Sequence, residues 1–190
     1  MLTSMLDRLV ATFDSSPWGG VTGRRIVAAH SAPLYTPEQR RRRDASGWTL
    51  VQGILAPVQF LIFLLSLGLV LRWLGTGLGE HEATLSVVAK TLALYLIMIT
   101  GAIWEKEVFG RYLFAPAFYW EDAFSMIVIA LHTAYLAALA TGVLSTRALM
   151  LLALAAYATY LINAGQFIMK LRAARRQETV WSGRMDGVSA

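Results

Sequence analysis

An unbroken apolar run, T-L-V-Q-G-I-L-A-P-V-Q-F-L-I-F-L-L-S-L-G-L-V-L (49–71), is the strongest structural signal in this chain. It contains no Asp, Glu, Lys or Arg. Three similar segments follow at about 84–104, 123–143 and 148–169. Each of the four has about 21–23 residues, which at ~1.5 Å per residue crosses a bilayer core ~30 Å thick. The sequence therefore predicts an all-α integral membrane protein with four spans.

The composition supports a membrane protein and excludes several functions. Of the 190 residues, 56% are hydrophobic and 15% are charged, against a usual ~25% charged. The absence of Cys rules out disulfides, thiolate metal sites and cysteine nucleophiles, and three His argue against a multi-histidine metal centre. The net charge of +5 does not indicate a nucleic-acid partner. The basic residues cluster beside the apolar runs, so membrane topology explains them.

The basic residues also predict the orientation of the spans. With a cytoplasmic N-terminus, fourteen of the seventeen Lys and Arg lie inside, in the N-terminal segment, the 105–122 connection and the C-terminal tail. Arg72, Lys90 and Arg147 then lie outside or at the outer ends of the spans. By the positive-inside rule, both termini are expected in the cytoplasm.

The outer connections, 72–83 and 144–147, are short, which predicts antiparallel neighbours and an up-down four-helix bundle. The membrane domain is expected over 35–176, with a flexible tail at 177–190. Apolar residues at helical spacing within 1–34 predict a short amphipathic helix on the membrane surface, and a poorly ordered segment is the alternative.

A helix start is predicted just before the first span. Thr36 can cap it, Pro37 suits its first position, and Gln39 can complete a capping box. The run Arg40 to Arg43 follows. It is typical of a positive-inside anchor, and attraction of an anionic substrate or lipid is the alternative.

Polar side chains within the spans need an explanation, because they are costly in hydrocarbon. Gln52 and Gln59 share one face of the first span, and Asn163 and Gln166 lie in the fourth. Hydrogen bonds between helices account for them. Alternatively, they line a polar pocket that opens toward the cytoplasmic side.

His132 lies near the middle of the third span, on the same face as Ser125 and Glu121. A hydrogen-bonded structural histidine is one interpretation. The other is an axial ligand to the metal of a tetrapyrrole, since neutral imidazole binds metals well.

The connection W-E-K-E-V-F-G-R-Y-L-F-A-P-A-F-Y-W-E-D (104–122) combines carboxylates with aromatic rings. Glu105 and Glu107 follow the second span, and Glu121 and Asp122 begin the third. A solvated helix end and a favourable helix dipole account for the two pairs. Desolvated carboxyl groups at an apolar boundary are also suited to proton transfer. No serine triad, phosphate loop or dinucleotide fingerprint is present.

Three stretches resemble the vinyl-bacteriochlorophyllide hydratase family of phototrophic bacteria. They are L-Y-T-P-E-Q-R-R-R-R-D-A-S-G-W-T-L-V-Q-G-I-L-A-P-V-Q-F (34–60), the 104–122 connection, and A-A-Y-A-T-Y-L-I-N-A-G-Q-F (155–167). The resemblance covers about 34–176. It implies addition of water to the C3 vinyl group of a chlorophyllide-type tetrapyrrole, which gives a 1-hydroxyethyl group during bacteriochlorophyll a synthesis.

Such a hydration needs a general acid, a base for water, and a dry aromatic slot. Either Glu105 or Glu121 is expected as the acid, with Glu107 or Asp122 assisting it or activating water. The aromatic wall and the amides that line the site are expected to be Trp104, Tyr112, Phe118, Tyr119, Trp120, Gln52, Gln59, Asn163 and Gln166.

The remaining expectations concern the substrate's charged groups. Lys106 or Arg111 can pair with its propionate, and His132 can contact its Mg. No cofactor of the protein's own is expected, because the substrate carries the metal. The lipid bilayer and other pigment-biosynthesis enzymes are expected partners, and the sequence does not predict an oligomeric state.

Two other functions are compatible with parts of this pattern. A non-catalytic pigment-binding or photosystem assembly protein would need nearly the same binding residues. A small transporter is disfavoured by the few mid-membrane charges and by the lack of an evident internal repeat.

Overall fold

The computed structural model describes residues 34–186, with side chains placed through residue 172. All regular structure in this range is helical: α2 (Pro37–Ala45), α3 (Gly47–Thr76), α4 (Glu80–Phe109), α5 (Tyr119–Thr141) and α6 (Thr146–Asp186). The chain divides into two compact units, of which Tyr35–Asn163 holds α2 to α5 and the first part of α6. The amphipathic helix predicted within 1–34 falls outside the described residues.

The four predicted spans are confirmed as helices that are long and apolar enough to cross a membrane. Each helix begins two to four residues before its predicted span. The difference arises because the first helical turn carries capping and polar residues that an apolar window leaves out. The backbone of α6 stays helical to Asp186, which extends into the predicted tail.

The local sequence sets where these helices begin and end. The predicted capping box is confirmed: Gln39 N donates to Thr36 Oγ1 at 3.2 Å, and Thr36 N donates to Gln39 Oε1 at 2.9 Å. Ser46 caps α3 by accepting from Trp48 N. α4 ends at Gly110, whose φ of 82° is left-handed and favours glycine because it has no Cβ.

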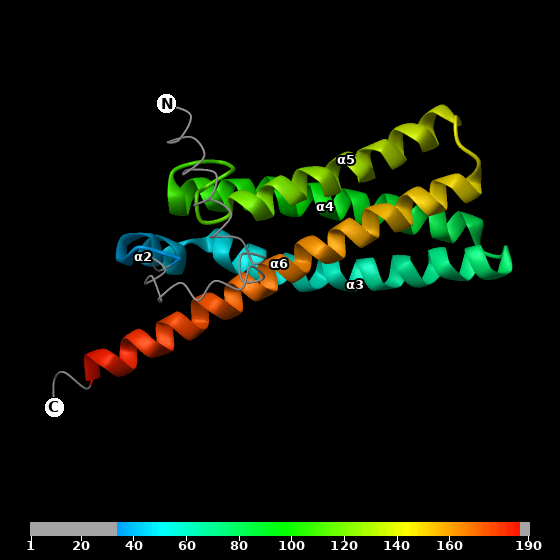
Figure 1. Ribbon diagram of the computed structural model, residues 1–190. Coiled ribbons are helices and arrows are strands. Elements are labelled where there is room, and N and C mark those ends of the chain that lie inside the picture. The colour runs from blue at the N-terminus through cyan, green and yellow to red at the C-terminus, as the bar shows by residue number, and fades with distance from the viewer. Residues whose placement is uncertain (1–33, 187–190) are drawn as a thin grey trace, which may run out of the picture. The chain divides into compact units, whose positions relative to one another are not determined.

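Within Tyr35–Asn163, successive long helices run in opposite directions (Figure 1). Polar contacts join neighbours along their length. Gln52 Nε2 on α3 donates to Thr100 Oγ1 on α4 at 2.8 Å. The hydroxyl groups of Tyr95 on α4 and Thr133 on α5 are 2.6 Å apart. These contacts fix the position of each helix along its neighbour.

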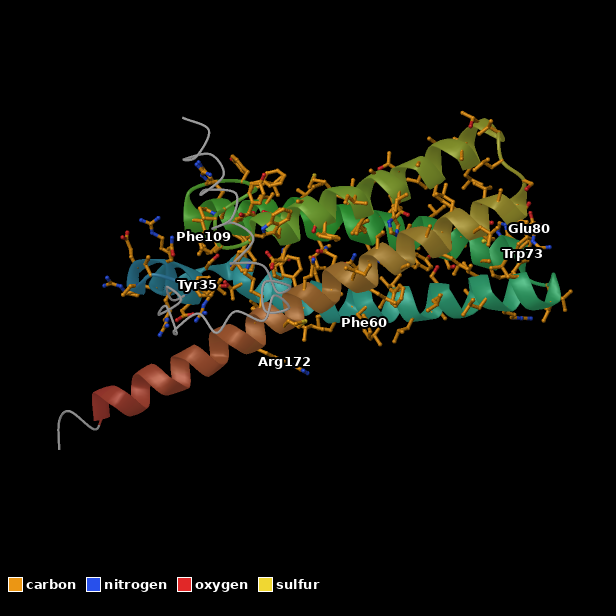
Figure 2. All side chains as sticks on the ribbon, in the orientation of Figure 1. Tyr35, Phe60, Trp73, Glu80, Phe109 and Arg172 are labelled. Carbon is orange, nitrogen blue, oxygen red and sulfur yellow. The ribbon has the colours of Figure 1, made fainter. Side chains whose placement is uncertain are left out.

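Figure 2 shows which residues lie at the two ends of this unit. Tyr35 and Phe109 lie at the end that carries α2 and the 110–118 connection, and Trp73 and Glu80 lie at the other. At that second end, Thr146 Oγ1 donates to Glu80 Oε1 at 2.9 Å, which joins the start of α6 to the start of α4.

The burial pattern is that of a protein surrounded by lipid. Large apolar side chains are exposed along the helices, among them Leu61, Leu65, Leu92 and Ile99. Polar side chains are buried instead, including Gln59, Ser66, Lys90, Thr91, Ser125 and His132. This arrangement indicates a bundle with a polar interior and an apolar outer surface, as expected in a bilayer.

Candidate active site

Two carboxyl groups meet at the 110–118 end of the bundle. Glu105, 4% exposed, lies in the last turns of α4, and buried Asp122 lies in the first turn of α5. Their side chains lie within hydrogen-bonding reach of each other. Because a hydrogen bond between two carboxyl groups needs a proton on one of them, the pair is arranged to hold a proton.

Consecutive backbone amides hold this pair in place. Ala115 N donates to Glu105 Oε1 at 2.6 Å, and Phe114 N donates to Asp122 Oδ2 at 2.7 Å. Phe114 has a φ of 59°, a left-handed conformation that is uncommon for a bulky residue. Such strain persists where surrounding contacts over-determine it, and here the two carboxyl groups supply those contacts. The 110–118 connection is therefore shaped around the pair.

The other two predicted carboxylates have different surroundings. Glu121 is fully buried beside Asp122 in sequence. Glu107 is exposed, and its Oε2 accepts a hydrogen bond from Ser46 Oγ at 2.7 Å. The structure thus brings Glu105 and Asp122 together, whereas Glu107 joins α4 to the α2–α3 junction.

The aromatic residues form a packed cluster and a more exposed group. Trp104, Phe109 and Phe118 pack edge to face with ring centroids 5.7–5.9 Å apart. Tyr35 stacks on Phe109 at 5.7 Å. The sequence pattern does not distinguish Tyr35 or Phe109 as site residues, although Tyr35 lies within the 34–60 stretch. This cluster closes the end of the bundle next to the carboxyl pair.

The more exposed group comprises Tyr112, Tyr119 and Trp120. Tyr112 and Tyr119 are exposed and Trp120 is half-buried. The rings of Tyr119 and Trp120 are 5.8 Å apart and nearly perpendicular. These three rings therefore present aromatic surface beside the connection.

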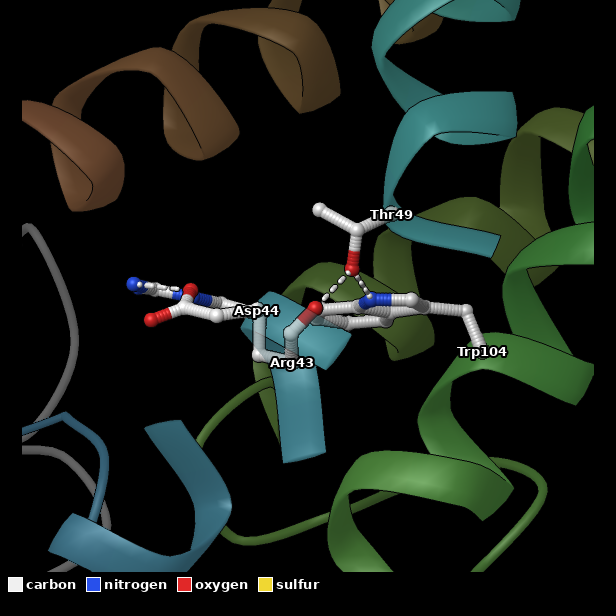
Figure 3. Close-up of polar contacts among 4 residues, drawn as sticks. All are labelled: Arg43, Asp44, Thr49 and Trp104. Carbon is white, nitrogen blue, oxygen red and sulfur yellow. Dashed lines mark hydrogen bonds and ion pairs between the residues drawn. The ribbon is translucent and has the colours of Figure 1, made fainter. Parts of the chain in front are cut away.

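A hydrogen-bonded chain fixes the indole of Trp104 (Figure 3). Trp104 Nε1 donates to Thr49 Oγ1 at 2.9 Å, and Thr49 Oγ1 donates to the carbonyl of Arg43 at 2.6 Å. The chain joins α4 to the junction between α2 and α3. It gives the Trp104 ring one orientation at the edge of the aromatic cluster.

The predicted cations of this end are exposed. Lys106 Nζ donates to the carbonyl of Gly110 at 3.0 Å and lies 5.4 Å from the centre of the Tyr112 ring. Arg111 is exposed. Both cations lie close in sequence to the carboxyl pair, but they are solvated.

The four predicted amides do not form one cluster. Gln52 pairs with Thr100, as described above. Asn163 Nδ2 donates to Ser125 Oγ at 2.8 Å. Buried Gln59 has no hydrogen-bond partner for Nε2 among the described residues. Gln166 belongs to the unit that contains α6 from Ala164 onward. For Gln52 and Asn163, hydrogen bonding between helices is confirmed.

The interior of the bundle holds His132, which is 1% exposed. Its Nδ1 lies 2.8 Å from the carbonyl of Val128, which can only accept, so Nδ1 is the donor. Nε2 has no hydrogen-bond partner among the described residues. In the neutral ring this leaves the Nε2 lone pair available, the arrangement usual in metal-binding histidines.

Lys90 is also inside the bundle, so its predicted position at an outer helix end is wrong. It is 0% exposed, and Nζ lies 3.9 Å from the centre of the Tyr160 ring. Nζ has no hydrogen-bond partner among the described residues. A lysine within an apolar span is by default a functional candidate, and that signal could have identified it from the sequence.

A chain of hydroxyl groups crosses the interior near these two residues. Ser66 Oγ on α3 lies 2.7 Å from Ser86 Oγ on α4 and 2.6 Å from the hydroxyl of Tyr157 on α6. The Tyr157 ring centroid is 5.9 Å from that of His132. The polar groups of this interior therefore come from α3, α4, α5 and α6.

Fold and site together define a helical membrane protein with a carboxyl pair at one end of its bundle and basic side chains in its interior. Residues 35–173 match the family model described as 2-vinyl bacteriochlorophyllide hydratase (BCHF). The chain belongs to this family.

Two curated relatives with the name 2-vinyl bacteriochlorophyllide hydratase are similar over most of their length. The protein of Cereibacter sphaeroides is 67% identical over 149 residues, which cover 78% of this chain and 92% of the relative. That of Rhodobacter capsulatus is 67% identical over 144 residues, which cover 76% and 84%. No solved structure matches the chain.

Proposed function

We propose that this chain adds water across the vinyl group of a bacteriochlorophyllide-type tetrapyrrole and forms a 1-hydroxyethyl group. The family and the two relatives carry this hydratase name. The observation on the molecule itself that carries the proposal is the buried Glu105–Asp122 pair with its two backbone amides. Hydration of an alkene needs a proton donor and a proton acceptor, and this pair supplies both within one contact.

The proposed reaction begins with proton transfer from the pair to the terminal vinyl carbon. The positive charge left on the inner carbon is spread over the conjugated macrocycle. Water then adds to the inner carbon, and the pair takes one proton from it. One water molecule is consumed, and the protonation state of Glu105 and Asp122 is restored by transfer between them.

The surroundings of the pair suit this chemistry. The cluster of Trp104, Phe109 and Phe118 keeps bulk water from one side, and exclusion of water strengthens electrostatic interactions in a site. Tyr112, Tyr119 and Trp120 offer aromatic surface for the macrocycle. Glu121 is the alternative proton donor, because it is buried in the same first turn of α5.

The Mg of the pigment is part of the substrate, and we assign its axial contact to His132 Nε2. The Nδ1 bond to Val128 fixes the ring and leaves Nε2 as the free nitrogen. His132 and Asp122 are ten residues apart on α5, about 15 Å of helix at ~1.5 Å per residue. The macrocycle, together with the side chains of His132 and Asp122, would span that distance. The protein needs no cofactor of its own in this scheme.

We further propose that the 110–118 end faces the cytoplasm, with both termini on that side of the cytoplasmic or intracytoplasmic membrane. The support is the excess of Lys and Arg at this end of the spans. Pigment made by other biosynthetic enzymes at the cytoplasmic face would then reach the carboxyl pair directly.

The test is incubation of the purified full chain in lipid nanodiscs with a vinyl chlorophyllide in water enriched in ¹⁸O and deuterium. The expected product carries one ¹⁸O in its hydroxyl group and one deuterium in its new methyl group. Binding of the pigment without any hydroxyethyl product would contradict the proposal and favour the pigment-binding alternative.

A further inference from the structure

We propose that Lys90 receives the free carboxylate of the pigment, beside His132, and thereby selects the acid form of the substrate over its esters. This inference rests on the function proposed above. It gives the acid-binding role to a buried residue of α4 and not to Lys106 or Arg111. The sequence alone favours those two cations, which lie in the 104–122 connection.

The first observation is that Lys90 Nζ lacks a polar partner. The residue is fully buried, and Nζ has no hydrogen-bond partner among the described residues. Its Nζ contacts the face of the Tyr160 ring, an attraction weaker than an ion pair. Burial of an ammonium without a counter-charge is strongly unfavourable. A carboxylate brought by the ligand would supply the missing charge.

The second observation is the composition of the surrounding interior. The sequence contains no Asp or Glu between Leu50 and Gly79 or between Ala83 and Trp104, nor any between Ala123 and Ala164. Lys90 Nζ lies over the Tyr160 ring on α6 and interacts electrostatically with His132 on α5. Ser86 lies one helical turn away on α4 and joins the hydroxyl chain. This interior is basic and hydroxyl-rich, and it suits an anion.

The position of Lys90 also fits a pigment held through its metal. His132 Nε2 and Lys90 Nζ are both unpartnered atoms in the same interior. A tetrapyrrole whose Mg contacts His132 carries its acid arm on the rim of the same ring. Lys90 and Glu105 are fifteen residues apart on α4, about 22 Å at ~1.5 Å per residue. The lysine side chain, the acid arm and the macrocycle together can bridge this distance.

The expected change in affinity distinguishes Lys90 from the exposed cations Lys106 and Arg111. An exposed ion pair changes affinity by about fivefold at most. Loss of one partner from a buried charge pair changes it by about 30-fold or more. A large preference for the acid over the ester can therefore come from Lys90, but not from Lys106 or Arg111.

The experiment titrates the full chain in nanodiscs with a vinyl chlorophyllide and with its methyl ester, and follows pigment absorption. The wild-type protein should bind the free acid at least about 30-fold more tightly than the ester. The Lys90→Met variant should lose this preference, whereas Lys106→Met and Arg111→Met should keep it. A preference that survives in Lys90→Met, or is lost in either surface variant, overturns the inference.

A stability measurement separates ligand binding from a structural role. Without pigment, Lys90→Met should unfold at the same temperature as the wild-type protein or higher, because an unpaired buried charge has been replaced by an apolar side chain of similar length. Thr91→Val, a buried change on the same helix, is the matched control and should keep the acid preference. A lower unfolding temperature for Lys90→Met would assign Lys90 to the fold and overturn the inference.

The same measurements distinguish the acid site from the proposed hydratase activity. Acid preference that depends on Lys90, without formation of the hydroxyethyl product, would reject the hydratase activity and leave the acid site standing. Hydration of acid and ester alike by both wild-type protein and Lys90→Met would reject only the acid site.

Discussion

Glu105 and Asp122 each accept a hydrogen bond from a backbone amide of the 110–118 connection and also contact each other. The same two side chains therefore shape the connection and form the proposed acid. The sequence allowed the acid to be narrowed to Glu105 or Glu121. It left Glu107 and Asp122 open as the assisting carboxylate, because the contact between Glu105 and Asp122 involves the connection that turns at left-handed Phe114.

The first prediction concerns Glu105→Gln. The amide oxygen of Gln can still accept from Ala115 N, so the fold should change little. The proton donor is lost, and kcat should fall by about 10²–10⁴-fold. The measurement is single-turnover hydration of vinyl chlorophyllide by protein in nanodiscs, together with its unfolding temperature.

Two further variants complete that test. Glu107→Gln is the matched control and should stay within a few-fold of wild type, because Gln can still accept from Ser46 Oγ. Glu121→Gln tests the alternative donor. Full activity in Glu105→Gln with loss in Glu121→Gln would move the acid to Glu121, and full activity in both would reject a carboxyl donor at this end of the bundle.

The second prediction concerns His132→Ala. Wild-type protein should bind the Mg pigment more tightly than its metal-free form, by about tenfold or more, which corresponds to about 1.4 kcal/mol. His132→Ala should bind both forms alike, because the free Nε2 is lost. Titration followed by the pigment absorption bands measures this. The metal-free pigment is the internal control, and an undiminished preference for Mg in the variant would disprove the axial contact.

A feature of a helix can be predicted from the sequence when the residues that produce it lie close together in the chain. The start of α2 was predictable because Thr36, Pro37 and Gln39 act within one turn. The contacts Ser46–Glu107 and Thr49–Trp104 were not, because residues 61 and 55 positions apart must meet. Those pairings depend on how α3 and α4 are rotated about their axes and how far one is displaced along the other. A single sequence does not give either quantity. Lys90 differs from these pairs, because its place within an apolar span could be read from the sequence.

The third prediction concerns the junction between α2 and α3. Ser46→Ala removes the cap of α3 and the donor to Glu107 together, and should cost about 1 kcal/mol of unfolding free energy. Activity at a permissive temperature should stay within a few-fold, because neither bond touches the carboxyl pair. Chemical denaturation in detergent measures the loss. Ser46→Thr keeps a hydroxyl group and should be close to wild type, and equal stability of Ser46→Ala would show that the junction contributes nothing.

For the molecule as a whole, the all-helical class and the four spans followed from apolar length alone, because the bilayer sets a minimum that few other segments meet. Their orientation follows from charge and not from packing, so the arrangement of the helices in Tyr35–Asn163 does not determine it. The direction in which the carboxyl pair faces consequently needs its own measurement.

The fourth prediction uses the absence of cysteine from the chain, which makes every introduced thiol unique. Arg41→Cys and Pro116→Cys mark the exposed end that carries the carboxyl pair, and Leu78→Cys and Val143→Cys mark the opposite end. In intact spheroplasts, a membrane-impermeant maleimide should label Leu78→Cys and Val143→Cys and should leave the other two unlabelled until the membrane is opened. The reason is that fourteen of the seventeen basic residues belong to the segments that precede the first span, join the second span to the third, or follow the fourth, and basic residues are retained in the cytoplasm. The cysteine-free wild-type chain is the control for background labelling. The reverse labelling pattern would place the Glu105–Asp122 pair at the outer face and would contradict the proposed orientation.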